Sequence, residues 1–326
     1  MHLRALFLLT LACATSAFAQ APKLAPLVER LGFAPGTRVL ILNADDFGMN
    51  HATNVGTMKA LKAGGMTSAT IMVPCAWFPE VVQFAKETPQ ANLGLHLTLT
   101  SEWKRYKWGP VAGWQAAPSL CDDLGYMFAD VPAVYLNAKM DDVEKEVRAQ
   151  IDRAYKAGLD VTHVDSHMGT LQYAPGYHEL YLKLAKAYNL PCRMAGRALM
   201  AKYGGEYLID KADEMGVVHP DELFQGQPDN DPKDEAANDA WWKKRIAECE
   251  PGKVSEIFIH CGSETPEMHA TTGTASRRTA DADYFSRPET LDYIKSQGIE
   301  LISYRELREL QRTGKPMPRV ARYGWD

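Results

Sequence analysis

Residues 39–50, VLILNADDFGMN, place two adjacent carboxylates, Asp45 and Asp46, directly after an apolar run. The run itself, residues 39–42, is typical of a strand that is buried on both faces of a parallel sheet. Two neighbouring carboxylates at the end of such a strand repel each other unless a positive charge lies beside them. A metal ion is the usual source of that charge, so we expect further metal ligands elsewhere in the chain.

Outward from this stretch, strand-like and helix-like segments alternate along the chain. The strand-like segments are 38–44, 67–73, 92–99, 160–167, 190–196, 254–261 and 299–303. The helix-like segments are 51–63, 77–87, 141–157, 175–189, 288–297 and 304–312, with a further short helix expected within 234–249. This alternation predicts parallel β-α-β units.

The number of strands favours an α/β fold built as a β/α-barrel, either TIM-like and regular or distorted and seven-stranded. Two long segments, 100–140 and 198–252, show no clear periodicity. We predict that both are loop insertions at the C-terminal rim of the barrel.

The first nineteen residues, MHLRALFLLTLACATSAFA, have the pattern of a secretory signal peptide, with a basic start at Arg4, a short apolar centre and a small-x-small ending. The apolar part is too short to span a bilayer. We expect cleavage before Gln20, export to the periplasm or the medium, and a single domain over residues 20–326. A lipid anchor at Cys13 is a weaker alternative.

The net charge and the lack of a further long apolar segment limit the classes of partner that we expect, and the cysteine count limits the number of disulfides. The net charge of -5 gives no basic surface for a nucleic acid, and no other segment is apolar enough to span a membrane. Five of the six cysteines follow the predicted signal peptide. Because five is odd, at least one thiol of the exported protein has no partner within the chain. We expect the cysteines after the signal peptide to be small buried apolar side chains, with one disulfide as an alternative. The sequence leaves the oligomeric state open, including a homodimer.

Ionisable side chains collect at the ends of the predicted strands. In a parallel barrel the C-terminal ends of the strands meet on one face, which is where active sites lie. We therefore expect one shared site from residues of several strands. In chain order the candidates are Asp45, Asp46, His96, His163, Asp165, His167, Arg193 and His260.

The spacing His163-x-Asp165-x-His167 puts three side chains on one face of a strand. One Asp and two His with open coordination positions suit Zn²⁺ or a similar divalent ion. Two interpretations of His163 and Asp165 remain open: a hydrogen-bonded pair in the core, or groups that orient a ligating imidazole from behind. Arg193 is a candidate for the same supporting role or for contact with substrate. For His260, a structural and a catalytic role are equally well supported.

The segment after His96 is rich in tryptophan. Trp103, Trp108 and Trp114 lie within a dozen residues that look exposed. Flat aromatic faces near a catalytic rim suit stacking on sugar rings. The alternative is that they pack the insertion onto the barrel. The pair at 241–242 is a similar candidate from the second insertion.

Three motifs, in this order, resemble a known family. NADDFG at 43–48, GLHLTLT at 94–100 and THVDSH at 162–167 are similar to motifs of the ChbG/YdjC-type carbohydrate deacetylases, which are related in mechanism to the NodB-type polysaccharide deacetylases. The resemblance runs from about Val39 to the final predicted helix. It implies a β/α-barrel that removes acetyl groups from N-acetylated sugars with one divalent metal ion.

Carried over to this sequence, the resemblance implies that Asp46, His96 and His167 bind the metal. It also implies that Asp45 is the general base and His260 the general acid. The sequence departs from the family pattern at two places. Residues 168–169, after the third motif, are Met-Gly rather than further histidines, and residues 261–262, after the late histidine, are Cys-Gly rather than a proline.

The expected reaction explains why the two acids are adjacent. One binds the ion while the other stays close enough to take a proton from the attacking water. Adjacent residues point apart on a regular strand, so the backbone must turn here, and we expect Phe47-Gly48 to make that turn. The ion is predicted to be zinc, with magnesium as the alternative, and the substrate an N-acetylated oligosaccharide such as a chitooligosaccharide or a cell-envelope glycan.

Two other functions remain open. One is a sugar-binding protein that keeps the barrel without catalysis. The other is a different metal-dependent hydrolase, such as a glycosidase or an esterase. A glycosidase needs two carboxylates several ångströms apart on either side of the bond, which adjacent acids supply poorly.

Overall fold

The structure is a computed structural model that describes residues 24–226 and 234–318. The predicted signal peptide, its cleavage site and the alternative lipid anchor at Cys13 lie outside the described residues. Whether residues 20–326 form a single domain stays a prediction.

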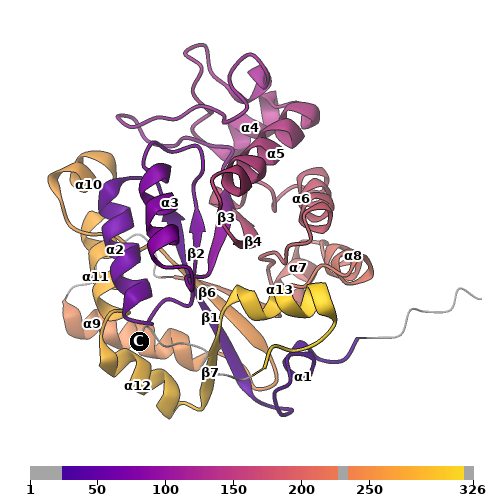
Figure 1. Ribbon diagram of the computed structural model, residues 1–326, viewed down its shortest axis with the longest axis vertical. Helices are drawn as coiled ribbons and strands as arrows, with labels where there is room; N and C mark the ends of the chain where they lie inside the picture. The colour runs from indigo at the N-terminus through magenta and orange to yellow at the C-terminus, as the bar shows by residue number, and fades with distance from the viewer. Residues whose placement is uncertain (1–23, 227–233, 319–326) are drawn as a thin grey trace, which may run out of the picture.

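The centre of the molecule is a seven-stranded sheet in which every pairing is parallel (Figure 1). The strand order is β4-β3-β2-β1-β6-β5, and β7 pairs with β1 beside this path. The strands are β1 (Arg38–Phe47), β2 (Ser68–Ile71), β3 (Leu93–Leu97), β4 (Val161–Ser166), β5 (Glu222–Gln225), β6 (Val254–Ile259) and β7 (Ile299–Ile302).

Strand β1 is the hub of this sheet. Along one edge, residues 39–44 pair with β6; along the other, residues 38–41 pair with β7 and residues 43–47 with β2. Nine of its ten residues are buried, so an apolar run was needed on both faces. Because all strands run in the same direction, their C-terminal ends lie at the same edge of the sheet.

Helices surround the sheet (Figure 1). Helix α11 packs on α2 and α9, α6 packs on α5 and α8, and α13 packs on β4. The helices are α1 (Leu27–Arg30), α2 (His51–Lys62), α3 (Phe78–Glu87), α4 (Val131–Asn137), α5 (Met140–Lys156), α6 (Pro175–Ala187), α7 (Arg197–Lys202), α8 (Tyr207–Met215), α9 (Glu235–Ala247), α10 (Pro266–Thr271), α11 (Ala275–Tyr284), α12 (Pro288–Ser296) and α13 (Tyr304–Thr313), with short 3₁₀ turns η1 (Pro118–Leu120) and η2 (His167–Gly169).

The gap between β4 and β5 is bridged by single backbone hydrogen bonds. Arg193 N donates to Val164 O, Cys192 N donates to Val218 O, and Asp221 N donates to Val254 O of β6. These bonds link the two ends of the strand path. The α/β prediction, a seven-stranded parallel sheet of TIM-like type inside a layer of helices, is confirmed in this distorted form.

Two segment predictions were wrong. Residues 190–196 form no strand, only an isolated bridge between Val164 and Cys192. Residues 198–252 are not an irregular insertion: the short helix predicted within 234–249 is confirmed as α9, but the segment also contains α7, α8 and β5. Strand β5 is four residues long and only partly buried, so it lacks the apolar run that marks β1. The prediction of an irregular segment over 100–140 is confirmed for residues 100–130 but not for 131–137, which form α4. Glu146 of α5 holds the irregular part by accepting the N–H groups of Val111 and Ala112 at 2.9 and 2.8 Å.

The five described cysteines are all buried and unpaired, as the preferred interpretation predicted: Cys75, Cys121, Cys192, Cys249 and Cys261. Within residues 24–226 and 234–318, none of the helices combines the length and the apolar character needed to cross a bilayer.

Candidate active site

The end of β1 turns at Asp46. Its φ of 65° lies in the left-handed region, and the register between β1 and β2 shifts between Ala44 and Phe47. The turn therefore begins one residue before the predicted Phe47-Gly48, although Gly48 also has a positive φ of 95°. This irregularity lets two adjacent carboxylates, Asp45 and Asp46, both remain in the interior, where each is only 2% exposed.

Three potential metal ligands meet at Asp46. Its Oδ1 lies 3.5 Å from His96 Nε2 and 3.4 Å from His167 Nδ1, and these three ligand atoms lie within 4.8 Å of one another. All three side chains are buried. The atoms come from the ends of β1 and β3 and from η2 immediately after β4, so strands on both sides of β2 supply them.

The residues present fit a divalent ion. Asp46 Oδ1 is buried and has no hydrogen-bond partner, and a buried carboxylate oxygen without a partner is costly. Burial raises the pKa of Asp46, but the charges of Arg278 and His260 outweigh burial and leave it well below its usual range. Burial lowers the pKa of His167, but Glu102 and Asp46 raise it to about 10. The negative charge around this cluster favours a cation between the carboxylate oxygen of Asp46 and the two imidazole nitrogens.

Asp165 lies behind His96. Its Oδ1 is 2.6 Å from His96 Nδ1, while its Oδ2 accepts a hydrogen bond from Thr70 at 2.9 Å. Burial lowers the pKa of His96, and the charges of Asp165 and Asp45 more than reverse that effect. The open interpretation of Asp165 as a carboxylate that orients a ligating imidazole matches this geometry.

Asp45 is held by Arg193. The guanidinium donates to both carboxylate oxygens at 2.8 and 2.7 Å, and Asn43 donates to Oδ1 at 2.8 Å. Arg193 also pairs with Asp165 at 2.9 Å and with Glu256 at 2.7 Å. Burial would raise the pKa of Asp45, but Arg193 and then His96 lower it well below its usual range. Asp45 is therefore an ionised carboxylate of fixed orientation.

His163 stands apart from the candidate ligands. Its ring stacks on Tyr304 with 3.6 Å between centroids, Thr162 lies 2.9 Å from Nδ1, and a Cβ at Gly94 would collide with the ring. Burial, followed by the charge of Arg193, lowers its pKa well below the usual value. His163 is thus a neutral core imidazole. It does not share a ligand cluster with Asp165 and His167.

His260 lies at the mouth of this cluster. It follows the last residue of β6, its Nε2 is 3.9 Å from Asp46 Oδ2, and its side chain is 39% exposed. The potential ligands are buried, so His260 is the imidazole here that an incoming molecule can touch. Burial lowers its pKa, and Asp46 offsets part of that effect.

Sequence reasoning missed two charged neighbours of the site. Arg278 of α11 donates to Asp46 Oδ2 at 2.8 Å, and Glu102 lies 3.0 Å from His167 Nε2. Arg278 lies in α11, a helix that the sequence did not predict, and Glu102 lies in the first insertion, which has no periodic pattern. Neither stands at the end of a strand, which was the only positional criterion available.

For Trp108 the packing alternative holds, because the side chain is 4% exposed and donates its indole N–H to Thr100 O at 2.9 Å. Trp103 is partly buried and packs edge-on against Trp108. Trp114 is exposed, with its ring beside Gly125. Trp242 is fully buried. The irregular backbone hid these contacts, because packing of a loop leaves no periodic pattern.

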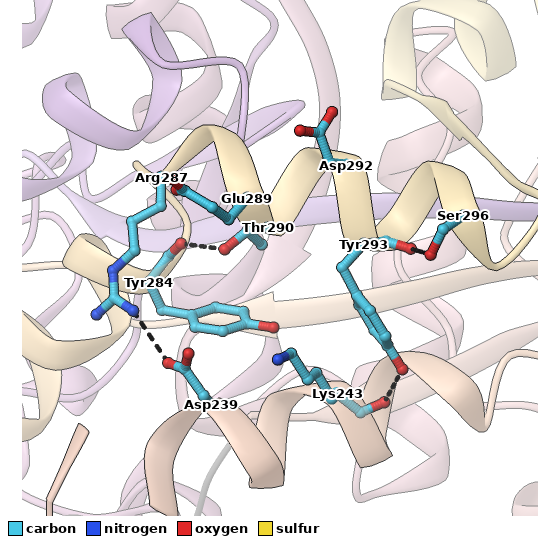
Figure 2. A pocket seen from close by; sticks show the side chains of 9 residues that line it. All are labelled: Asp239, Lys243, Tyr284, Arg287, Glu289, Thr290, Asp292, Tyr293 and Ser296. Carbon is cyan, nitrogen blue, oxygen red and sulfur yellow. Dashed lines mark hydrogen bonds and ion pairs between the residues drawn. The ribbon is translucent and has the colours of Figure 1, made fainter. Parts of the chain in front are cut away.

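A cavity of about 330 Å³ lies elsewhere, between α9, the end of α11 and α12 (Figure 2). Many of its polar groups bond to one another: Arg287 pairs with Asp239 at 3.1 Å, and Tyr293 donates to Lys243 O at 3.1 Å. None of the candidate ligands lines it. It is a hollow between helices rather than an extension of the site.

Known proteins share this chain's organisation. A carbohydrate deacetylase from Brevibacillus brevis is 30% identical over 268 residues, covering 82% of this chain and 99% of the relative. One from Thermus thermophilus is 40% identical over 164 residues, covering 50% of this chain and 56% of the relative. A crystal structure from Enterococcus faecalis, of a protein described as a cellobiose-phosphate cleavage protein, matches with a TM-score of 0.72 and 26% identity, covering 83% of this chain and 99% of that chain.

The family model described as YdjC-like protein matches residues 39–296. That range begins within β1 and ends with the last residue of α12. It therefore contains the three candidate ligands and the carboxylates beside the two imidazoles, Asp165 and Glu102. With the sheet, the ligand cluster and the full-length relatives in agreement, the chain belongs to the YdjC-like family.

Proposed function

We propose that this protein is a metal-dependent hydrolase that removes acetyl groups from N-acetylated carbohydrates. Membership of the YdjC-like family and the relatives named carbohydrate deacetylases support this proposal. The observation that carries it is the unpartnered Asp46 Oδ1, which faces two imidazole nitrogens inside the buried edge of the sheet. Such a cluster serves a metal ion better than it serves sugar binding alone.

Asp46, His96 and His167 would hold one divalent ion. Two nitrogens and one oxygen suit Zn²⁺, whereas Mg²⁺ prefers oxygen ligands, so we propose zinc. When bound, the ion supplies a Lewis acid that lowers the pKa of a water and polarises the acetyl carbonyl.

The contacts of the other residues support the roles that we assign to them. Asp45, ionised and oriented by Arg193, would take a proton from the attacking water. Its low pKa makes it a weak base, which is sufficient for a water that is already acidified. Arg278 fixes Asp46 from the opposite side.

His260 is the proposed proton donor to the departing sugar amine. Its partial exposure allows contact with substrate. Because its pKa is lowered, chiefly by burial, the free enzyme holds a neutral imidazole at neutral pH. The ring must therefore gain a proton from solvent before it releases one to the amine, and Asp45 returns the proton of the attacking water to solvent. We therefore expect the substitution His260→Ala to slow turnover about 10²–10⁴-fold, the usual range for general acid–base catalysis.

The alternatives lose support. The sugar-binding alternative relied on a group of exposed tryptophans after His96, but Trp108 is buried and Trp103 is partly buried, which leaves only Trp114 of the three exposed. A glycosidase needs two carboxylates with a substrate bond between them. Here Asp45 is bonded to Arg193 and Asp46 to Arg278.

The deciding experiment measures acetate release from a panel of N-acetylated oligosaccharides. The purified protein is assayed before chelation, after chelation, and after return of Zn²⁺ or Mg²⁺. We expect release that chelation abolishes and zinc restores. No release from any substrate by protein shown to contain metal would reject the deacetylase proposal.

We also propose that the protein is exported and acts on a chitooligosaccharide or a cell-envelope glycan. The support is the signal-like pattern of residues 1–19. N-terminal sequencing of the protein recovered from fractionated cells tests this proposal, and a mature protein that starts at Gln20 is expected. An intact first residue in the cytoplasmic fraction would contradict it.

A further inference from the structure

We propose that Glu102 is a positioning residue that fixes the ring of His167, so that Nδ1 and not Nε2 faces Asp46. The inference rests on the metal dependence in the proposed function, but its test does not require turnover. The proposed role of Glu102 gives the tryptophan-rich insertion a function, which neither the sequence patterns nor the ligand cluster explains.

The His167 ring lies between two carboxylates. Glu102 Oε2 is 3.0 Å from Nε2, and Asp46 Oδ1 is 3.4 Å from Nδ1. A neutral imidazole carries one N–H, and the hydrogen bond made by one nitrogen decides which nitrogen keeps a free lone pair. When the ring is neutral, as a metal ligand must be, Glu102 accepts the remaining proton at Nε2, so the lone pair of Nδ1 would be free for an ion beside Asp46.

His96 shows the same arrangement with the nitrogens exchanged. Asp165 occupies its Nδ1 at 2.6 Å, and Nε2 faces Asp46 Oδ1. Each imidazole therefore has a carboxylate on its far nitrogen and its near nitrogen towards the same oxygen. The sequence made Asp165 a candidate for orienting a ligating imidazole, without naming which one, because Asp165 stands on a predicted strand. Glu102, the partner of His167, lies in a loop and was not a candidate.

Trp108 holds that loop in place. Its indole donates to Thr100 O at 2.9 Å, and its backbone N–H donates to Ser101 Oγ at 3.1 Å. Ser101 N in turn donates to Phe128 O at 2.7 Å. The two residues before Glu102 are thus fixed by hydrogen bonds with Trp108 and with Phe128. The Trp108 ring lies edge-on to His167 with 6.5 Å between centroids. The buried tryptophan supports a metal ligand rather than a sugar ring.

Glu102 acts through His167 and is not itself placed as a ligand. It is outside the group of atoms that converge on Asp46 Oδ1, and it lies on the far side of the ring. Burial raises its pKa, but the charge of His167 lowers it below the usual value, so the carboxylate is ionised. Carboxylates in this position typically change metal affinity 10–100-fold when removed.

The test measures metal affinity by calorimetry, with Zn²⁺ added to chelated and dialysed protein. Glu102→Ala is expected to weaken affinity 10–100-fold. Glu102→Gln keeps an acceptor oxygen for Nε2–H and should recover part of that loss. Glu264 provides the matched control, because its carboxylate lies 2.9 Å from His269 Nε2 on an exposed loop. Glu264→Ala should bind zinc as the unsubstituted protein does.

X-ray absorption of the cobalt-loaded protein separates positioning from ligation. The number of nitrogen and oxygen ligands should be the same with and without Glu102→Gln. Loss of one oxygen ligand would make Glu102 a ligand and overturn the inference. So would a zinc affinity of Glu102→Ala within twofold of Glu264→Ala.

Trp108→Phe offers a second route that leaves Glu102 in place. It removes the bond to Thr100 O and should weaken zinc affinity in the same direction by a smaller factor. If native protein binds no divalent ion, the proposed function fails together with this inference. If it binds zinc and releases acetate while the Glu102 variants keep full affinity, only this inference fails.

Discussion

Asp46 combines two requirements in one residue. It must offer a carboxylate oxygen to two imidazoles, and its backbone must adopt a positive φ of 65°. A non-glycine residue in this conformation costs of order 1–3 kcal/mol, although Asp and Asn tolerate it better than other residues. Strain at this position is consistent with a functional turn, because a regular strand would direct one of the two acids away from the cluster.

Asp45→Asn should separate metal binding from turnover. Asparagine preserves the shape of the side chain and removes the charge that would accept a proton, while the group around Asp46 is untouched. We expect zinc content near that of the unsubstituted protein and acetate release lower by about 10²–10⁴-fold. Metal analysis and initial rates on the same sample check this. Full activity would remove Asp45 from the role of base.

Asp281 should make stability depend on pH. Burial raises its pKa to about 7, despite the hydrogen bond from Trp242 and the charges of Arg277 and Arg278. The folded protein therefore keeps a proton that the unfolded chain releases near its ordinary pKa. The stabilisation that comes from this proton is fully present below that ordinary pKa and is lost as the pH rises to about 7. Across this range the free energy of unfolding falls by at most about 1.4 kcal/mol per pH unit.

The substitution Asp281→Asn should remove this loss, because asparagine stays neutral and can still accept from Trp242. Its Tm relative to the unsubstituted protein should rise between pH 5 and pH 8, by roughly 2–4 °C per kcal/mol. Asp283→Asn, on the exposed side of the same helix, is the control and should give parallel melting curves. A constant difference for Asp281→Asn across that range would contradict the raised pKa.

At the scale of elements, α2 approaches the loop after β6 through a glycine. A Cβ at Gly56 would lie 2.3 Å from Gly262 O. Gly262 N donates to Arg278 O, and Gly262 is two residues beyond His260. The position of α2 therefore sets the position of two side chains around Asp46. The close approach requires glycine for space rather than for backbone freedom.

Gly56→Ala should displace this loop and lower the free energy of unfolding by about 1–3 kcal/mol, the usual cost of overpacking. Gly176→Ala in α6 is the matched control, because no atom lies within 4 Å of a Cβ there, and it should be neutral or stabilising by about 0.4–1 kcal/mol. Urea denaturation measures both. Equal stabilities for the two variants would show that the loop yields without cost.

At the scale of the whole molecule, opposite charges from distant segments share one interior. The carboxylates of Asp45, Asp46 and Asp165 are balanced by two guanidinium groups, those of Arg193 and Arg278. This group joins β1, β4 and α11 with the segment that follows α6, which carries Arg193. A divalent cation at Asp46 would therefore stabilise the whole sheet and not only the site.

Chelation should consequently lower the Tm, and zinc should restore it. A ligand at one hundred times its Kd stabilises the folded state by about 2.7 kcal/mol. Differential scanning fluorimetry with and without chelator measures the change. The variant His167→Ala should melt at one temperature in both conditions. An equal chelator shift in that variant would place the bound metal elsewhere.

The sequence by itself determined the strands that carry apolar runs and the ligands at their ends. Asp46, His96 and His167 were among the candidates because a strand end is a local feature, and parallel strands must bring such ends together. The family resemblance then singled out these three as the expected ligands. Only the tertiary structure decided that Asp46 makes the turn, that His163 is a core residue stacked on Tyr304, and that Glu102, Arg278 and β5 complete the site and sheet. These depend on contacts between segments far apart in the chain. Such contacts leave no periodic pattern, because the partner that stabilises each of them is not a sequence neighbour.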